Sequence, residues 1–269
     1  MANDLSAGSN PRSNALLELL PDDEWRRLAP YLESVDMPQG SVLNESGDCL
    51  RYMYFPTTAV VSLSYVMENG ASGEVAVIGK DGLVGVSMLM TSAKTLHRAV
   101  VQTAGQAFRL PGQIIKAEFD RAGLLHELFL GYMLALINHT SQTAICNRHH
   151  SVDQQLCRRL LQSLDLQDDN EIVVTQERIA GMLGVRREGI TAAALSLQQA
   201  GLIKYARGRI SILDRPGLEK RSCECYCAVR SEYRRLLPVL GSRNKSAEFG
   251  PPRYRPAISA ARLLNTATA

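Results

Sequence analysis

Five basic side chains gather in one short stretch of this sequence and could bind a polyanion. Positions 186 to 209 carry a single carboxylate, Glu188, and these cations: Arg186, Arg187, Lys204, Arg207 and Arg209. The planar donor fork of arginine matches phosphate oxygens and the acceptor edge of guanine, and a carboxylate can accept a hydrogen bond from cytosine. The formal net charge of the whole chain is only +3, so the indication of DNA binding comes from local placement.

Two predicted helices joined by a glycine would position these side chains. Thr175 can cap the first helix, and the apolar stripe of that helix is Ile179, Ala180 and Leu183. Gly184 permits a sharp turn at positive φ. The second helix has an apolar face, with Ile190, Ala194 and Leu197, and a polar face, with Arg187, Glu188, Thr191 and Ala192. This arrangement predicts a helix-turn-helix whose second helix enters a DNA major groove. The alternative is an ordinary helical hairpin in a core, which the basic residues argue against.

A predicted hairpin follows the second helix. Residues 201–213 read GLIKYARGRISIL, two short strands with a turn near Arg207-Gly208-Arg209. Helix, turn, helix and hairpin in this order make a winged helix. We predict that bases are read by Arg187, Glu188, Thr191 and Ala192. We predict that phosphates are bound by Thr175, Arg186, Lys204, Arg207 and Arg209.

The chain is long enough, at 269 residues, for more than one domain. From Val35 to Leu110 it consists of short β-branched stretches between turns, which is typical of an antiparallel β-roll. We therefore expect an α+β fold with these boundaries: 1–13 disordered, 14–118 β-roll, 119–148 long helix, 149–237 winged helix-turn-helix, and 238–269 flexible tail.

A long helix is predicted after the β-roll. Residues 114–147 carry an apolar stripe that would extend on the order of 45 Å. Such a helix is longer than a small domain normally buries, so we expect a homodimer through this stripe. The predicted interface residues are Leu125, Leu128, Tyr132, Leu136, His139 and Thr143. The alternative is that the stripe packs against the β-roll of its own chain.

The order of β-roll, long helix, leucine-rich helix and winged helix resembles the Crp/Fnr family of bacterial transcription regulators. The most specific match is Ile179-Ala180-x-x-Leu183-Gly184-Val185-Arg186-Arg187-Glu188-Gly189-Ile190, and the resemblance extends from about Asn14 to Leu237. It implies a homodimer on double-stranded DNA with an inverted-repeat operator, and RNA polymerase as a partner. The Arg-Glu pair that reads bases in the family falls on Arg187 and Glu188. A third base-reading position, often arginine, is Ala192 here, so the target half-site differs.

The segment that corresponds to the family's cyclic-nucleotide pocket lacks the expected polar residues. Family members that bind a cyclic nucleotide carry Gly-Glu and Arg-Ser in this segment. Here it contains Gly85, Val86, Ser87 and Met88, and later His97 and Arg98. Since the Val86 side chain cannot accept a hydrogen bond, we expect neither cAMP nor cGMP to bind tightly. The apolar residues either form core or accommodate an apolar ligand, so the effector stays unidentified and no cofactor is expected.

Three of the six cysteines lie close together near the C-terminus. Cys223, Cys225 and Cys227 fall in a helix predicted from about 215 to 237. At about 100° per residue, Cys225 points away from the other two thiols, so the three could bind one metal only if the helix breaks. We therefore predict no metal site, with a thiol redox switch as the alternative. Packing or linker roles are expected for His139, His149 and His150.

Several classes of function find no support in the sequence. It shows no signal peptide, no apolar run near the length of a bilayer span, and no disulfide framework typical of secreted proteins. It also lacks the spacing of common catalytic or phosphate-binding motifs. We expect a cytoplasmic protein that is neither an enzyme nor membrane-bound. The alternative function is a ligand- or partner-binding dimer, with or without thiol redox sensing, whose winged helix does not read DNA.

Overall fold

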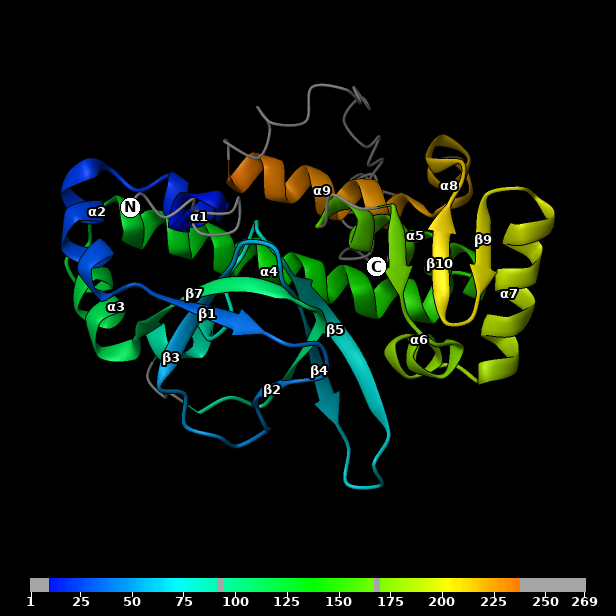
Figure 1. Cartoon of the computed structure of the whole chain (residues 1–269), viewed down its shortest axis with the longest axis horizontal. Coiled ribbons are helices and arrows are strands. Elements are labelled where there is room, and N and C mark those ends of the chain that lie inside the picture. The colour runs from blue at the N-terminus through cyan, green and yellow to red at the C-terminus, as the bar shows by residue number, and fades with distance from the viewer. Residues whose placement is uncertain (1–9, 91–93, 167–169, 238–269) are drawn as a thin grey trace, which may run out of the picture.

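The computed structural model describes residues 10–90, 94–166 and 170–237 (Figure 1). Most of the predicted disordered N-terminus and the whole predicted tail lie outside these residues. The N-terminal boundary at residue 13 is wrong, because Pro11–Ser13 forms a short 3₁₀ helix, η1. The side chain of Asn10 caps it by accepting a hydrogen bond from the amide of Arg12 at 3.0 Å.

Two antiparallel sheets form the β-roll. One has the strand order β1-β7-β3 and the other β2-β6-β4-β5. Strands β1, β2, β3 and β4 span Glu33–Met37, Val42–Asn44, Tyr52–Pro56 and Val60–Val66. Strands β5, β6 and β7 span Ser72–Ile78, Arg98–Thr103 and Gly105–Pro111. Both sheets contribute side chains to one buried core, including Met37, Val61, Ile78 and Val101. The predicted β-roll is confirmed.

Short helices close one end of the β-roll. They are α1 (Ala15–Glu18), α2 (Asp22–Leu28) and the 3₁₀ turn η2 (Ala29–Tyr31). Asn14 has no exposed surface, and it caps α1 through its side-chain oxygen. Its amide nitrogen donates to the carbonyls of Pro56 at 2.9 Å and Gly82 at 2.8 Å. This one side chain therefore fixes the N-terminal helices to the end of β3 and to the loop at Gly82.

The long helix is shorter than the sequence predicts because the chain turns before it. Helix α3 spans Gly112–Phe119 and α4 spans Leu124–His149. Between them Ala122 adopts a left-handed φ of 55°. The buried carboxylate of Glu24 accepts from the amides of Leu124 and Leu125, both at 2.9 Å, and so caps α4. In Figure 1, α4 runs along the long axis of the molecule behind the β-roll.

The apolar stripe predicted as the dimer interface is mostly core of the single chain. Leu125 and Tyr132 have no exposed surface, and His139 and Thr143 are also buried. Leu128 and Leu136 are partly buried against the same cores. The four buried residues cannot form the predicted interface, because the β-roll and the C-terminal helix cover them. On the outer side α4 exposes a different apolar set: Leu130, Leu134, Ile137 and Ile145.

The C-terminal third folds around a second core. Its elements are α5 (Val152–Asp165), β8 (Glu171–Val173), α6 (Gln176–Leu183), α7 (Arg187–Gln199), β9 (Ile203–Ala206), β10 (Arg209–Ile212) and α8 (Arg215–Arg221). Helix α5 begins with a capping box formed by Ser151 and Gln154. Leu156 and Leu160 of α5 pack with Ile190 and Leu197 of α7. The predicted leucine-rich helix therefore anchors the second helix of the pair.

The helix predicted over 215–237 is interrupted. The chain leaves the helical conformation at Ser222 and Cys223, whose ψ values are 163° and 165°, and α9 then spans Glu224–Leu236. Helix α9 lies beside α4, and its Val229 and Tyr233 join the core of the β-roll. None of the helices in the described residues is both long and apolar enough for a bilayer span.

Candidate DNA-binding interface

The turn between α6 and α7 has the geometry predicted from the sequence. Thr175 is the N-cap of α6, and its hydroxyl accepts from the amide of Arg178 at 3.2 Å. Gly184 ends α6 with a left-handed φ of 65°. Right after it, the amide of Val185 donates to the carbonyl of Ala180 at 3.0 Å. A helix-turn-helix is therefore present.

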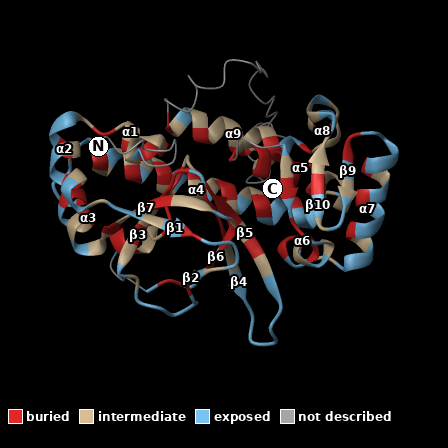
Figure 2. Ribbon diagram, viewed as in Figure 1, coloured by how far each residue is buried: buried red, intermediate tan, exposed pale blue. Residues whose placement is uncertain are grey.

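Helix α7 has one covered and one open face. Its buried residues are Ile190, Ala193, Ala194 and Leu197. The four side chains predicted to read bases are all exposed, as is the outer face of α7 in Figure 2. The sequence prediction left out Leu195, which is 53% exposed one helical turn after Thr191. Because Leu195 follows Thr191 by four residues, helical spacing alone could have placed it on the same exposed face.

Thr191 also links the two helices of the motif. Its hydroxyl lies 2.9 Å from Oε1 of Gln176 and 3.1 Å from the carbonyl of Arg187, and it can donate to either. Because a hydroxyl has one proton, an additional partner of Thr191 would have to be a donor. The arrangement fixes the side chain at the exposed surface, between the start of α6 and the start of α7.

A tight turn forms the tip of the wing. Arg209 pairs with Ala206, which leaves Arg207 and Gly208 as a two-residue loop with φ values of 50° and 75°. These values define a type I′ hairpin turn, and Arg207 at its tip is exposed. Strand β10 also pairs with β8, so the predicted two-stranded wing is part of a three-stranded sheet.

The predicted phosphate contacts divide into two groups. Arg186, Lys204 and Arg207 are exposed at the turn and the wing. Thr175 uses its hydroxyl as a helix cap, and Arg209 forms an ion pair with Glu171. Burial raises the pKa of Tyr205 on β9, while the positive charge of Arg187 acts in the opposite direction. The amide of Tyr205 on β9 also donates to the side chain of Gln198 on α7 at 2.9 Å, so α7 and β9 form one surface.

Of the residues predicted to line an effector pocket, Met88 is buried and the others are partly exposed. Gly85, at φ 108°, precedes the 3₁₀ turn η3 (Val86–Leu89). Met88 is 8% exposed, and a Cβ on Gly112 would lie 1.9 Å from its terminal methyl group. The hydroxyl of Ser87 is buried and has no hydrogen-bond partner among the described residues. The Met88 side chain is therefore packed closely against Gly112.

His97 and Arg98 interact with other parts of the β-roll. The imidazole of His97 packs edge-on against Tyr65 at 4.6 Å, and burial lowers its pKa. Nε of Arg98 lies 3.0 Å from the carboxylate of Glu45. The guanidinium is thus already paired with an acid of its own chain.

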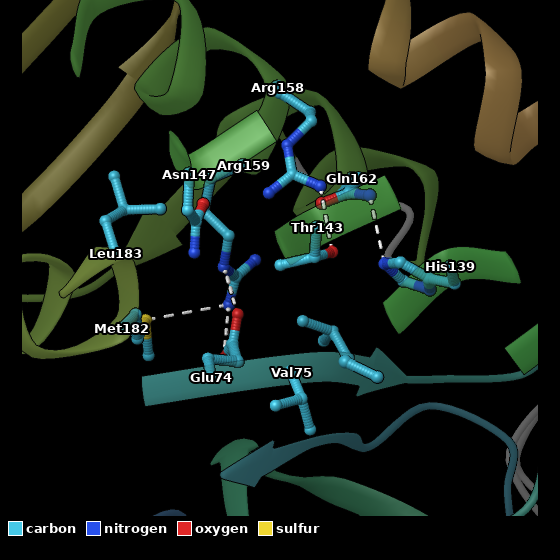
Figure 3. Close-up of a pocket in the computed structure, with 12 residues that line it drawn as sticks. Glu74, Val75, His139, Thr143, Asn147, Arg158, Arg159, Gln162, Met182 and Leu183 are labelled. Atoms are coloured by element: carbon cyan, nitrogen blue, oxygen red, sulfur yellow. Dashed lines mark hydrogen bonds and ion pairs between the residues drawn. The ribbon is translucent and has the colours of Figure 1, made fainter. Parts of the chain in front are cut away.

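A buried polar junction connects the β-roll to the DNA-binding half (Figure 3). Arg159 of α5 and Glu74 of β5 are 4% and 8% exposed, and Nε of Arg159 lies 2.6 Å from Oε1 of Glu74. Arg159 also donates to Gln102 at 2.5 Å, and Ser62 donates to Glu74 at 2.6 Å. A cavity of about 10 Å³ beside the pair has room for about one water molecule.

His139 of α4 lies at the same junction. Its Nε2 is 3.2 Å from Nε2 of Gln162, and its Nδ1 is 3.5 Å from the hydroxyl of Tyr233. Burial, followed by the positive charges of Arg158 and Arg159, lowers the pKa of His139 to about 3. The imidazole is therefore neutral at neutral pH, in agreement with the packing role expected for it.

The fold and this surface define a class of protein: a DNA-binding regulator in which a β-roll precedes a winged helix. Two family models agree with this class. The cyclic nucleotide-binding domain matches residues 34–122, and the Crp-like helix-turn-helix domain matches residues 154–221. Together they cover more than half of the chain. The protein belongs to the Crp/Fnr family and is a DNA-binding transcription regulator of that type.

Solved structures share the fold at low sequence identity. A Crp/Fnr-family regulator from Eubacterium rectale has a TM-score of 0.61 and 20% identity, covering 76% of this chain and 96% of its own. FixK2 from Bradyrhizobium japonicum has a TM-score of 0.60 and 12% identity, covering 71% and 98%. The regulator CLP of Xanthomonas campestris, described as responsive to c-di-GMP, has a TM-score of 0.57 and 15% identity, covering 72% and 100%. No curated protein matches the sequence.

Proposed function

We propose that this protein is a homodimeric, sequence-specific regulator that binds an inverted-repeat operator without control by cAMP. The observation that carries the proposal is the exposed face of α7. It begins with Arg187 and Glu188, beside a wing whose tip is Arg207. A helix that presents a bidentate donor and an acceptor in its first turn is suited to reading base edges in the major groove.

Two kinds of contact are expected on DNA. Arg187→Ala should cost about 1–3 kcal/mol of binding free energy and relax the base preference at one position. Arg207→Ala should weaken binding to all sequences to a similar degree, because a phosphate contact carries no base information. Arg186 and Lys204 should behave like Arg207, because they too are expected to contact phosphates. Equal, sequence-independent losses for Arg187→Ala and Arg207→Ala would contradict it.

The outer stripe of α4 supports the homodimer. Leu130, Leu134, Ile137 and Ile145 are 44–55% exposed, and the first three alternate in steps of four and three residues. That spacing is the seam of a two-stranded coiled coil, so a second copy of α4 would cover the stripe. A two-fold dimer places its recognition helices on half-sites about one DNA turn apart.

The dimer can be tested by measuring the molar mass in solution. Ile137→Asp places a charge in the centre of the stripe and should convert the dimer to monomer. Leu213→Asp is the matched control, since Leu213 is 61% exposed outside α4, and it should remain dimeric. A wild-type protein that is monomeric at tens of micromolar would refute this interface.

The absence of cAMP control is supported by the packing around η3. Val86 offers no acceptor, the Met88 side chain lies against Gly112, and Arg98 is paired with Glu45. Calorimetric titration of the full-length protein with cAMP and cGMP should give no heat of binding in the micromolar range. Micromolar or tighter binding of either nucleotide would overturn this part of the proposal.

The deciding experiment is selection of genomic DNA fragments by the purified protein without added ligand. Wild type should enrich one inverted-repeat motif, and the double variant Arg187→Ala, Glu188→Ala should not. A thermal unfolding curve for the variant that matches wild type excludes misfolding as the cause. Enrichment of the same motif by both proteins would show that α7 does not read the bases.

A further inference from the structure

Four side chains with metal-binding chemistry converge at the junction of α4, α5 and α9. They are Cys146, His150, Cys223 and Cys225, and their ligand atoms all lie within 4.8 Å of one another. The three cysteines are buried and form an apolar cluster of their own. The side chain of His150 is 16% exposed. Nothing in the DNA-binding surface uses these residues.

Local structure explains how residues about 75 positions apart come together. Cys146 lies in the last turn of α4, and His150 is the residue that ends this helix, four positions later. Cys223 is the N-cap of α9 and Cys225 lies in its first turn. The break at Ser222 and Cys223, absent from the predicted continuous helix, allows both thiols to face the end of α4.

The distances fit a single ion. Sγ of Cys146 is 3.5 Å from Sγ of Cys223, and Sγ of Cys225 is 3.4 Å from Nδ1 of His150. Four ligands at about 2.3 Å from a tetrahedral zinc ion are about 3.8 Å apart. A small outward movement of the side chains would therefore reach this geometry. We propose that Cys146, His150, Cys223 and Cys225 bind one Zn²⁺ ion in a closed Cys₃His site.

The surroundings match those of a metal site. Nε2 of His150 lies 3.3 Å from the carboxylate of Glu224, and its Nδ1 faces the thiols. A carboxylate on the far nitrogen fixes the tautomer that leaves Nδ1 free to bind a metal. On the other side, Nε2 of Gln142 donates to Sγ of Cys225 at 3.0 Å. The cluster thus has an outer layer of hydrogen bonds to two of its four ligands.

The charge around the cluster is also suitable. Three thiolates, one neutral imidazole and Zn²⁺ sum to a net charge of −1. Arg158 is 2% exposed, donates to Thr143 at 3.1 Å, and pairs with no carboxylate among the described residues. Its positive charge acts on Cys146. The first turn of α9 adds positive potential at Cys225. A buried cation without a counter-ion is costly, and the metal centre would supply one.

The site would have a structural role. It is closed by four protein ligands, which is the pattern of structural rather than catalytic zinc. It would join the end of α4 to the start of α9. The end of α4 directly precedes α5, which begins at Val152. Because the ligands come from both halves of the chain, bound metal would stabilise the junction between the β-roll and the DNA-binding half.

The test is metal content of the full-length protein purified in reducing buffer without chelator, with elemental analysis by mass spectrometry. Wild type should contain one zinc per chain. Cys225→Ser and His150→Gln should lose it. The matched controls Cys227→Ser and His149→Gln change a neighbouring cysteine and histidine outside the cluster, and both should keep it. Retention of zinc by all four variants, or a wild type that takes up no Zn²⁺ after supplementation, would overturn the proposal.

Binding of Co²⁺ to the wild-type protein provides a second test, which does not depend on how well the variants fold. Titration of metal-free wild type with Co²⁺ should saturate at one equivalent, with the intense near-ultraviolet and visible bands of tetrahedral thiolate coordination, and Zn²⁺ should displace it. Stoichiometric Co²⁺ uptake without thiolate bands would contradict the assigned ligands. A disulfide between Cys146 and Cys223 in protein handled without oxygen would also contradict it. None of these measurements requires DNA, so their failure is distinct from failure of the proposed regulator function.

Discussion

Breaking the ion pair between Glu74 and Arg159 should destabilise the protein more than any exposed ion pair. Glu74→Gln keeps the size of the side chain and its contact with Ser62, but it removes the negative charge facing Arg159. The guanidinium then stays buried, with Gln102, Ser163 and the sulfur of Met182 as its other hydrogen-bond partners. Because a neutral amide cannot balance a buried cation, the whole junction is affected.

The magnitude follows from burial. Removing one partner of a buried pair costs about 3–5 kcal/mol, a large part of the about 5–15 kcal/mol that stabilises a typical domain. Arg159→Met should cost a similar amount, since it leaves Glu74 charged and buried. The double variant removes both charges, so its cost should be smaller than the sum of the single costs by about 2–3 kcal/mol.

Urea unfolding followed by circular dichroism measures these differences. The matched control is the exposed pair Glu33 and Arg109, whose side chains are 51% and 33% exposed. Glu33→Gln should cost less than about 1 kcal/mol. Additive costs in the Glu74 and Arg159 cycle, or a Glu74→Gln cost no larger than that of Glu33→Gln, would refute the view that this pair stabilises the junction.

Three further outcomes are expected. Arg207→Asn should leave the free energy of unfolding unchanged or raise it by up to about 1 kcal/mol, since asparagine suits the type I′ turn, while DNA affinity falls for all sequences and its salt slope decreases by about one. Because the pKa of His139 is about 3 when folded and 6.5 in the ordinary case, the unfolded chain binds the proton more readily. Stability should therefore fall by about 2 kcal/mol from about pH 7 to pH 5 in denaturant titrations, and His139→Gln should remove most of this slope. Gly105→Ala should cost more than about 2 kcal/mol, because its Cβ would lie 2.4 Å from the backbone nitrogen of Ala59. Gly73→Ala, with open space at its Cβ, should cost under about 1 kcal/mol in the same assay.

Local signals were sufficient to predict the winged helix. Thr175, Gly184 and the Arg207-Gly208 pair each act within a few residues, as a cap, a left-handed helix end and a hairpin turn. Their effect on the chain does not depend on distant contacts. The exposed and buried faces of α7 follow from helical period alone. For these reasons the predicted elements and the observed ones agree closely from Thr175 to Ile212.

The errors arose where distant segments decide the outcome. The stripe from Leu125 to Thr143 has the right period for a helix face, but periodicity does not tell which partner covers it. Here α9, from more than 80 residues further along the chain, contributes Val229 and Tyr233 to that core. The apolar residues that α4 leaves exposed, such as Ile137, were the less regular set in the sequence. Similarly, the Glu24 carboxylate that caps α4 is 100 residues away from Leu124.

The cysteines show the same limit of prediction from sequence, here at one short break between two helices. Two extended residues, Ser222 and Cys223, separate α8 from α9 and turn two thiols toward α4. The sequence holds the separate parts, a Cys-x-x-x-His at the end of one helix and a Cys-x-Cys at the start of another. Their convergence depends on α9 packing along α4, which periodicity alone does not specify.

Two sets of contacts hold the DNA-binding half, as one unit, against the rest of the chain. The Arg159 pair joins α5 to β5, and the Cys₃His cluster joins the end of α4 to the start of α9. Helix α5 shares its core with α7, so a displacement of α5 carries the recognition helix with it. The turn at Gly184 and the cap at Thr175 lie within that unit and keep their geometry. In the proposed dimer, a change at the Arg159 ion pair or at the Cys₃His cluster would therefore alter how the two recognition helices are spaced on DNA, while the bases that each one reads stay the same.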